Sequence, residues 1–178
     1  TVGGGLRMNS GYFKKEFKDI LVSVQAVDRT GKVLTISVSK IKFSYRENDL
    51  DKDLIFLSAS FKGEFKEKGK IQEYMKVIKN KKDYTQPTKI KTGGSTFKNP
   101  IKQTDQKVWE LIKKSVPLDT KFGDAEISKK HCNFFVNNNN ATFEDMKKLI
   151  EFVKENVKLK TGIIIETEIE IVQWKKKF

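Results

Sequence analysis

The 178-residue sequence has almost none of the residues that form disulfides and zinc sites. It contains one cysteine, Cys132, and one histidine, His131. A single cysteine cannot form an internal disulfide, and the pair leaves too few ligands for a zinc site built from Cys and His. The two are sequence neighbours, so on a strand their side chains would point to opposite faces, and we expect no Cys/His catalytic dyad. We therefore expect no metal site, and a reducing cytoplasmic location.

Long apolar runs are also lacking. No run approaches the ~20 residues that span a bilayer, and we expect no signal peptide. We therefore expect no membrane partner. The sequence also opens without an initiator methionine, from which we expect a fragment of a longer protein.

Arginine is scarce, although the net charge of the chain is +13. Only Arg7, Arg29 and Arg46 are arginines among 36 basic residues, and the lysines are spread over nearly every segment. Nucleic-acid readers usually cluster their charge and use the arginine fork for bidentate contacts. The diffuse lysine therefore favours a compositional bias of the source genome, with an anionic substrate as a second reason. A lysine-rich, non-catalytic nucleic-acid-binding protein stays the alternative.

The apolar residues, 37% of the chain, suffice for a real core in one domain or two small ones. Apolar patterning predicts strands over 20–27, 33–38 and 54–61, and helices over 67–82, from about 108, and after a capping box at Thr142 and Asp145. For the second helix we expect an N-cap at Thr104 or Asp105. We expect the stripe of the first helix (Ile71, Tyr74, Met75 and Ile78) to lie in the core. Alternating isoleucine and glutamate over 163–172 predicts a strand with one polar face.

Residues 92–100, Thr-Gly-Gly-Ser-Thr-Phe-Lys-Asn-Pro, combine backbone freedom with reactive groups. Two adjacent glycines let a ligand approach the backbone closely while Ser95 projects forward. Lys98 and Asn99 offer a point charge and an amide within reach of a phosphate or sugar. A glycine-rich turn before a helix is the structural alternative.

This segment resembles the signature of the UDP-N-acetylenolpyruvoylglucosamine reductase family, and other segments match the family in the same order. Residues 1–11 resemble its flavin-contacting segment, which implies that Gly3 and Gly4 lie against the FAD pyrophosphate. The Tyr-Arg pair at 45–46 implies a catalytic Arg46. Residues 122–134 match the family's Gly-Asp-Ala-Glu-Val-Ser segment and the His, Asn and Phe strand after it. The terminal strand implies a catalytic Glu168. The family usually has serine at the position of Asn48, to which we assign no role.

The resemblance implies an α+β fold. Residues 1–85 would be the trailing half of a PCMH-type FAD-binding domain, 86–173 a small substrate domain of antiparallel sheet and helices, and 174–178 a basic tail. The implied enzyme is a monomeric, cytoplasmic UDP-N-acetylmuramate dehydrogenase of peptidoglycan synthesis, which uses FAD and NADPH to reduce the enolpyruvyl group of a UDP-sugar. In this scheme Ser95 donates a proton, Arg46 and Glu168 stabilise the developing anion, and Lys98 and Asn99 bind the substrate.

Two points limit what the resemblance implies for this chain. The family carries most of its FAD site before the residues matched here, so we expect weak or no flavin binding by the chain alone. An FAD-linked oxidase is the other flavin-dependent alternative. It is disfavoured because the Ser95 loop and the Glu168 strand belong to the substrate half of the family. We expect Ser95, Arg46 and Glu168 to converge on one pocket.

Overall fold

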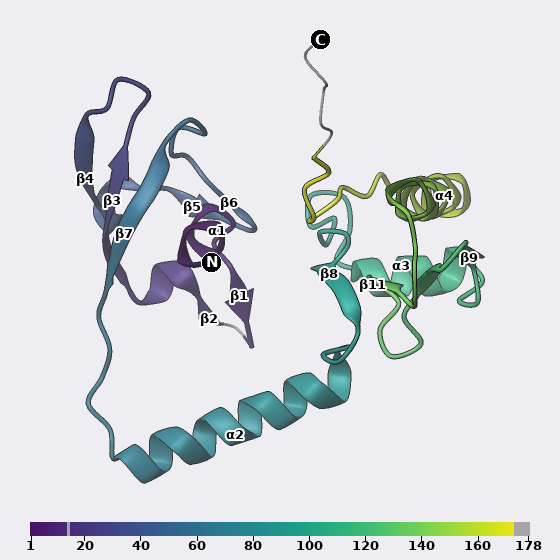
Figure 1. Ribbon diagram of the computed structural model, residues 1–178, viewed down its shortest axis with the longest axis horizontal. Helices are drawn as coiled ribbons and strands as arrows, with labels where there is room; N and C mark the ends of the chain where they lie inside the picture. The colour runs from purple at the N-terminus through teal and green to yellow at the C-terminus, as the bar shows by residue number, and fades with distance from the viewer. Residues whose placement is uncertain (14, 173–178) are drawn as a thin grey trace. The chain divides into compact units, whose positions relative to one another are not determined.

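The computed structural model describes residues 1–13 and 15–172. It contains helices and antiparallel sheets, so the predicted α+β class is confirmed (Figure 1). The chain divides into two compact units, Thr1–Glu67 and a second unit from Lys68 onward. This division groups the helix after Glu67 with the second unit, whereas the sequence placed it in the first domain. The predicted domain bounds stay predictions, and the predicted basic tail lies outside the described residues.

The first unit is built on a three-stranded antiparallel sheet in the order β4-β3-β7. The strands are β3 (Leu21–Val27), β4 (Val33–Ser37) and β7 (Ile55–Phe61), which confirms the three predicted strands. Smaller elements surround the sheet: α1 (Val2–Arg7), β1 (Gly11–Tyr12), β2 (Lys15–Glu16), the 3-10 helices Phe17–Asp19 and Val38–Lys40, β5 (Phe43–Ser44) and β6 (Glu47–Asn48). Its core is small and contains Leu6, Leu21, Val24 and Ile41.

The helix predicted after the third strand is present as α2 (Lys68–Thr85), but its predicted burial is wrong. None of its residues is buried within the described part of the chain, and the side chains of Tyr74 and Met75 are each 63% exposed. A period of 3.6 residues shows which side chains share one face of a helix. It does not show that another element covers that face.

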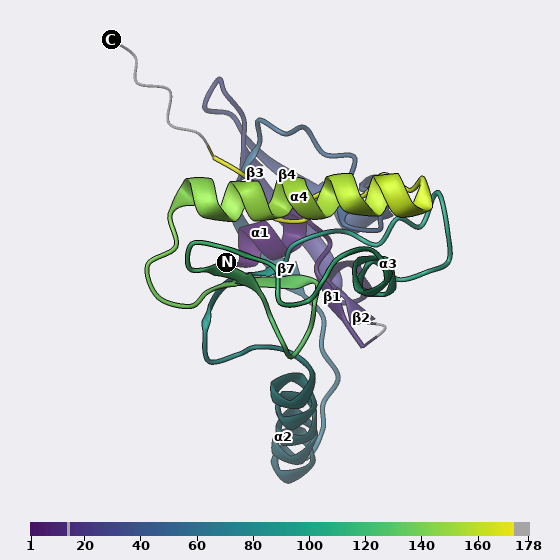
Figure 2. The same cartoon turned by 90° about the vertical axis from the view of Figure 1, so that its right-hand side faces the viewer.

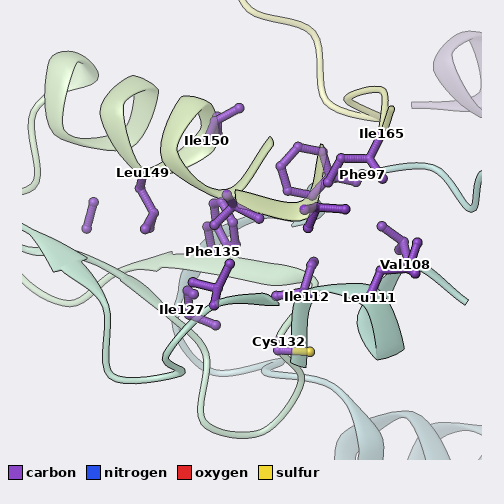
Figure 3. Packing of buried hydrophobic residues seen from close by; sticks show 14 residues of the cluster. Phe97, Val108, Leu111, Ile112, Ile127, Cys132, Phe135, Leu149, Ile150 and Ile165 are labelled. Carbon is purple, nitrogen blue, oxygen red and sulfur yellow. The ribbon is translucent and has the colours of Figure 1, made fainter. Parts of the chain in front are cut away.

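The second unit contains a four-stranded antiparallel sheet in the order β8-β11-β10-β9. Its strands are β8 (Lys91–Ser95), β9 (Lys121–Phe122), β10 (Ala125–Ile127) and β11 (Phe134–Asn137). Helices α3 (Val108–Ser115) and α4 (Phe143–Thr161) share one apolar cluster with Ile127 and Phe135, which are paired neighbours on the sheet. Both helices therefore cover the same face of the sheet; Figure 3 shows the side chains of this shared cluster. In Figure 2 α4 is seen along its length and α3 end-on, so the two helices cross.

The starts of these two helices differ in how well local sequence predicts them. The capping box at Thr142 and Asp145 is confirmed, with the Thr142 hydroxyl accepting from the Asp145 N–H at 3.1 Å. The N-cap of α3 is Lys107, so the predicted cap at Thr104 or Asp105 is wrong. Two side chains accept hydrogen bonds from the free N–H groups at the start of α3. Glu110 accepts from the Lys107 N–H, and Asn99, nine residues before Val108, accepts from the Val108 N–H. Here a cap from a preceding loop replaces the local one.

The strand predicted over 163–172 is wrong as a regular strand. The described part of this segment makes a single antiparallel bridge, between Phe97 and Thr167. The alternation still sorts the side chains, because Ile165 is 1% exposed and Ile163 and Ile169 pack against the core. Towards residue 164 the next donor on the opposite segment would be Pro100, which has no N–H. Towards residue 170 the ladder does not continue because the Thr96 N–H donates to the Asn133 carbonyl instead.

Candidate functional site

Ser95 lies at the end of β8, where the strand is bent. Gly94 precedes it with a φ of 92°, which a residue with a Cβ rarely adopts. The Thr92 hydroxyl supports this bend, because it accepts from the Gly94 N–H at 3.2 Å and donates to the Phe135 carbonyl at 2.8 Å. Ser95 itself is half-buried and pairs with Phe134 of β11. The predicted glycine-rich loop is therefore a bent strand end that presents the serine at the sheet edge.

Asn133 holds this strand end in place, and sequence reasoning gave it no functional role. Its side chain is buried; the amide oxygen accepts from the Phe97 N–H at 3.0 Å, and the amide nitrogen donates to the Phe97 carbonyl at 2.9 Å. Its own carbonyl accepts from the Thr96 N–H at 2.7 Å. The signal was present in the sequence as the asparagine of the His-Cys-Asn-Phe segment. Asn133 thus fixes the backbone that follows Ser95.

Glu168 lies beside the serine strand, although the two are 73 positions apart in sequence. The Glu168 N–H donates to the Thr96 carbonyl at 2.8 Å, and the Lys98 N–H donates to the Glu166 carbonyl at 2.9 Å. These two bonds flank the Phe97–Thr167 bridge. The structure therefore sets the segment that carries Ser95 and Lys98 beside the segment that carries Glu168, within the second unit.

The two predicted substrate-binding residues have different surroundings. The Lys98 ammonium is 4.0 Å from a carboxylate oxygen of Glu166, whose side chain is 77% exposed. A surface pair of this length contributes little, so the ammonium is still available to an anion. The Asn99 amide oxygen accepts from the Val108 N–H at 3.0 Å and thereby caps α3. Asn99 thus has a structural role, and substrate binding by both residues stays a prediction.

Arg46 occupies the turn between β5 and β6 in the first unit. Its φ is 58°, in the left-handed region, and its guanidinium carbon is 5.0 Å from the centroid of the Tyr45 ring. The ring face attracts the guanidinium. The predicted convergence of Arg46 with Ser95 and Glu168 stays a prediction.

The glycines predicted to contact FAD lie in the six-residue helix α1. Gly3 lines a cavity of about 250 Å³ whose other lining residues are apolar except for Ser58, while the Gly4 N–H donates to the Thr1 hydroxyl at 3.1 Å. Sites for drug-sized ligands usually span ~300–1,000 Å³. The lining side chains would therefore suit an apolar edge of a dinucleotide. Cofactor contact at Gly3 and Gly4 stays a prediction.

His131 and Cys132 line a second cavity, of about 620 Å³, together with residues that include Trp109, Lys113 and Leu118. The Cys132 thiol donates to the Trp109 carbonyl at 3.2 Å, and His131 Nδ1 accepts from the Asn133 N–H at 3.2 Å. Burial raises the pKa of the Cys132 thiol, which disfavours the nucleophilic thiolate. No cluster of three or more metal-binding side chains occurs in the part of the chain that the structure describes.

Replacing Asn133 by alanine is expected to lower the free energy of unfolding of the second unit by about 2–3 kcal/mol. The change leaves the buried Phe97 N–H and carbonyl without their partners, and each unsatisfied group costs roughly 1–3 kcal/mol. Urea unfolding followed by circular dichroism measures the effect. Asn139→Ala, at an exposed turn, is the control. Equal stability of Asn133→Ala and wild type would contradict the assigned role of Asn133 in holding the backbone at Phe97.

The stability of the second unit is expected to fall as the pH drops from about 7 to about 5. Burial lowers the pKa of His131 below its ordinary value of 6.5, so the unfolded chain takes up a proton at a higher pH than the folded chain. The contribution of neutral His131 to the free energy of unfolding is therefore fully present well above pH 6.5. It declines as the pH falls towards the lower pKa of the folded state. Because His131 is the one histidine of the chain, the urea midpoint of His131→Gln should change little with pH over this range. If the urea midpoint of that variant still fell with pH as in the wild type, the pH dependence would come from a group other than His131.

Fold and site together define a class: a small α+β domain in which the segment that carries Ser95 and Lys98 pairs through its backbone with the segment that carries Glu168. Residues 86–172 match the sequence model of a family described as UDP-N-acetylenolpyruvoylglucosamine reductase, C-terminal domain. The chain is 66% identical over 173 residues to the UDP-N-acetylenolpyruvoylglucosamine reductase of Pelagibacter ubique, and 44% identical over 170 residues to that of Rickettsia conorii. These alignments cover 97% and 96% of this chain, and 57% of each relative.

A solved structure agrees with the sequence relatives. The crystal structure of the UDP-N-acetylenolpyruvylglucosamine reductase (MurB) from Thermus caldophilus matches with a TM-score of 0.80 at 29% identity, covering 95% of this chain and 59% of that one. The resemblance inferred from the motifs is therefore confirmed. The chain spans somewhat more than half the length of the relatives it matches. No helix among the described residues is long and apolar enough to cross a membrane.

Proposed function

We propose that this chain supplies the substrate-side residues of a UDP-N-acetylmuramate dehydrogenase, an oxidoreductase of peptidoglycan precursor synthesis. The enzyme would use NADPH and FAD to reduce UDP-N-acetylglucosamine enolpyruvate to UDP-N-acetylmuramate. The observation that carries the proposal is the hydrogen bond from the Glu168 N–H to the Thr96 carbonyl, because it sets Glu168 beside the serine strand. The relatives, which bear the reductase name, support the same assignment.

Saturation of the enolpyruvyl double bond requires one hydride and one proton. FAD, once reduced by NADPH, would supply the hydride when bound. The Ser95 hydroxyl then donates the proton to the neighbouring carbon. A serine hydroxyl holds its proton tightly in water, so a cation that stabilises the alkoxide lowers the barrier. Lys98, three residues along the same bent segment, is the cation in the described second unit that we assign to this task.

Charge develops on the substrate carboxylate and on the adjacent carbon before the proton arrives. Arg46 stabilises that charge electrostatically through its guanidinium. Glu168, if held protonated by its surroundings when the substrate is bound, would help to stabilise the same anion. Lys98 and Asn99 hold the nucleotide-linked sugar. The described residues thus provide acid, anion stabilisation and substrate contacts, while the electrons come from the cofactors.

The chain alone should bind flavin weakly or not at all. The cavity beside Gly3 is small and mainly apolar, so it offers one edge of a flavin site. The remaining FAD contacts would come from the part of the longer relatives that this chain does not cover. We further propose a monomeric enzyme of the cytoplasm that binds neither membrane nor nucleic acid.

Two measurements test the proposal. In the flavin-loaded enzyme, NADPH oxidation should require the enolpyruvyl UDP-sugar, and oxidation at the same rate without that sugar would favour an FAD-linked oxidase. The second measurement is a salt titration of binding to single- and double-stranded DNA and RNA. Tight binding with a steep salt slope would favour the lysine-rich nucleic-acid-binding alternative. We expect saturable binding of the UDP-sugar and weak, unspecific binding of nucleic acid.

A further inference from the structure

The turn that carries Arg46 has an unfavourable backbone conformation. Ser44 of β5 pairs with Glu47 of β6, so Tyr45 and Arg46 form the connection between the two strands. Arg46 has a φ of 58°, and residues with a Cβ are disfavoured in the left-handed region. Such a conformation persists where surrounding contacts hold it. The contacts that hold this hairpin therefore decide where the guanidinium of Arg46 is directed.

Asn48 fixes the second strand of the hairpin to the end of α1. Its amide nitrogen donates to the carbonyls of Leu6 and Arg7, at 3.1 and 2.9 Å. Its amide oxygen accepts from the Leu50 N–H at 3.1 Å. The last carbonyls of a helix have no partner within the helix, so this side chain both caps α1 and anchors the hairpin. Neither serine nor aspartate has the two N–H donors that these carbonyls receive from Asn48.

Asn9 fixes the first strand from the same end of α1. Its side chain is fully buried, and its amide nitrogen donates to the Ser44 carbonyl at 3.1 Å and to a Glu16 carboxylate oxygen at 3.0 Å. Its amide oxygen accepts from the Lys18 N–H at 3.2 Å. Both strands of the hairpin are thus tied to the segment that contains the two glycines of the predicted flavin contact.

We propose that Asn48 is a positioning residue for Arg46. Asn48 and Asn9 hold the strands on either side of the turn, so the left-handed backbone of Arg46 depends on hydrogen bonds that Asn48 makes to α1. The same bonds couple α1 to the arginine. The catalytic consequence rests on the function proposed above for Arg46, whereas the structural consequence does not.

A protease that cleaves after arginine tests the structural consequence. The chain has three such sites, and Arg29, in the turn between β3 and β4 with its ion pair to Asp53, is the internal reference. Asn48→Asp preserves size and an acceptor but removes both N–H donors. In the flavin-loaded enzyme, we expect cleavage after Arg46 relative to Arg29 to rise about tenfold, through more frequent local opening. Asn48→Ser, with one hydroxyl donor, should give an intermediate ratio.

Asn156→Asp is the matched control, because Asn156 also donates to a helix carbonyl, that of Phe152 in α4. Its cleavage ratio should equal that of the wild type. An unchanged ratio in both Asn48 variants would overturn the proposal. An equal rise at Arg29 and Arg46 would also overturn it, since Asn48 would then stabilise the whole unit and not the turn.

Turnover separates this proposal from the proposed function. If Asn48 acts through Arg46, Asn48→Asp should lower kcat, and adding it to Arg46→Asn should cause no further loss. Additive losses in the double variant would contradict positioning through Arg46. If Asn48→Asp alters the cleavage ratio while Asn48→Asp and Arg46→Asn both retain a normal kcat, Asn48 positions the turn and Arg46 has no catalytic role.

Discussion

Ser95→Ala in the flavin-loaded enzyme is expected to lower turnover of the enolpyruvyl UDP-sugar by roughly 10²- to 10⁴-fold, the usual contribution of a positioned proton donor. Reduction of the flavin by NADPH should continue at the wild-type rate, because Ser95 takes no part in that half-reaction. Stopped-flow absorbance of the flavin measures the two half-reactions separately. The variant should therefore accumulate reduced flavin in the presence of the sugar.

The control for this variant is Ser39→Ala, in an exposed 3-10 turn of the first unit, which should leave both half-reactions unchanged. We expect Ser95→Ala to lower the free energy of unfolding only slightly, since Ser95 is only half-buried at the strand end. A fall in stability is therefore not an adequate explanation for a large loss of turnover. Normal turnover by Ser95→Ala would remove the serine from the role of acid.

Arg46→Asn is expected to lower turnover by about 10²–10³-fold, the loss typical of removing one donor to a developing oxyanion. Asparagine is the most informative replacement because it tolerates the left-handed φ of 58° that the turn requires. The variant therefore removes the guanidinium while preserving the backbone. Steady-state kinetics with NADPH and the enolpyruvyl sugar measure the loss, which should appear in kcat more than in KM.

Two controls accompany Arg46→Asn. Arg29→Asn, in another hairpin turn, removes an exposed guanidinium and its 2.8 Å ion pair with Asp53, and should leave kcat unchanged. Arg46→Lys preserves the charge but loses the planar fork, so partial activity is expected. If Arg46→Asn raised KM alone, the guanidinium would be a substrate-binding group and would have no role in anion stabilisation.

Several parts of the protein could be predicted from short stretches of sequence. Alternating apolar residues and a glycine-containing turn predicted the β3–β4 hairpin, and the Thr142/Asp145 pair predicted the start of α4. These features depend on contacts within a few residues of each other, so the local sequence contains their cause. The motif resemblance singled out Ser95 and Glu168 in the same way, by residue identity at short range.

Other parts required the tertiary structure. The stripe of α2 was expected in the core, but no described residue of that helix is buried. The Val108 N–H at the start of α3 is capped by Asn99 of the preceding loop, and the role of Asn48 appears only once its bonds to Leu6 and Arg7 are seen. In each case the deciding partner belongs to another element or loop. A pattern in one segment does not contain that information.

The sequence by itself determined most of the regular elements, because periodicity and local hydrogen-bonding groups act over a few residues. The α+β class and the candidate acid, Ser95, followed from the motif resemblance. Only the tertiary structure decided that Glu168 lies beside the strand of Ser95, and that Asn133 and Asn48 hold the two candidate site segments. The physical reason is that a hydrogen bond between segments forms only where the folded chain brings donor and acceptor to about 3 Å.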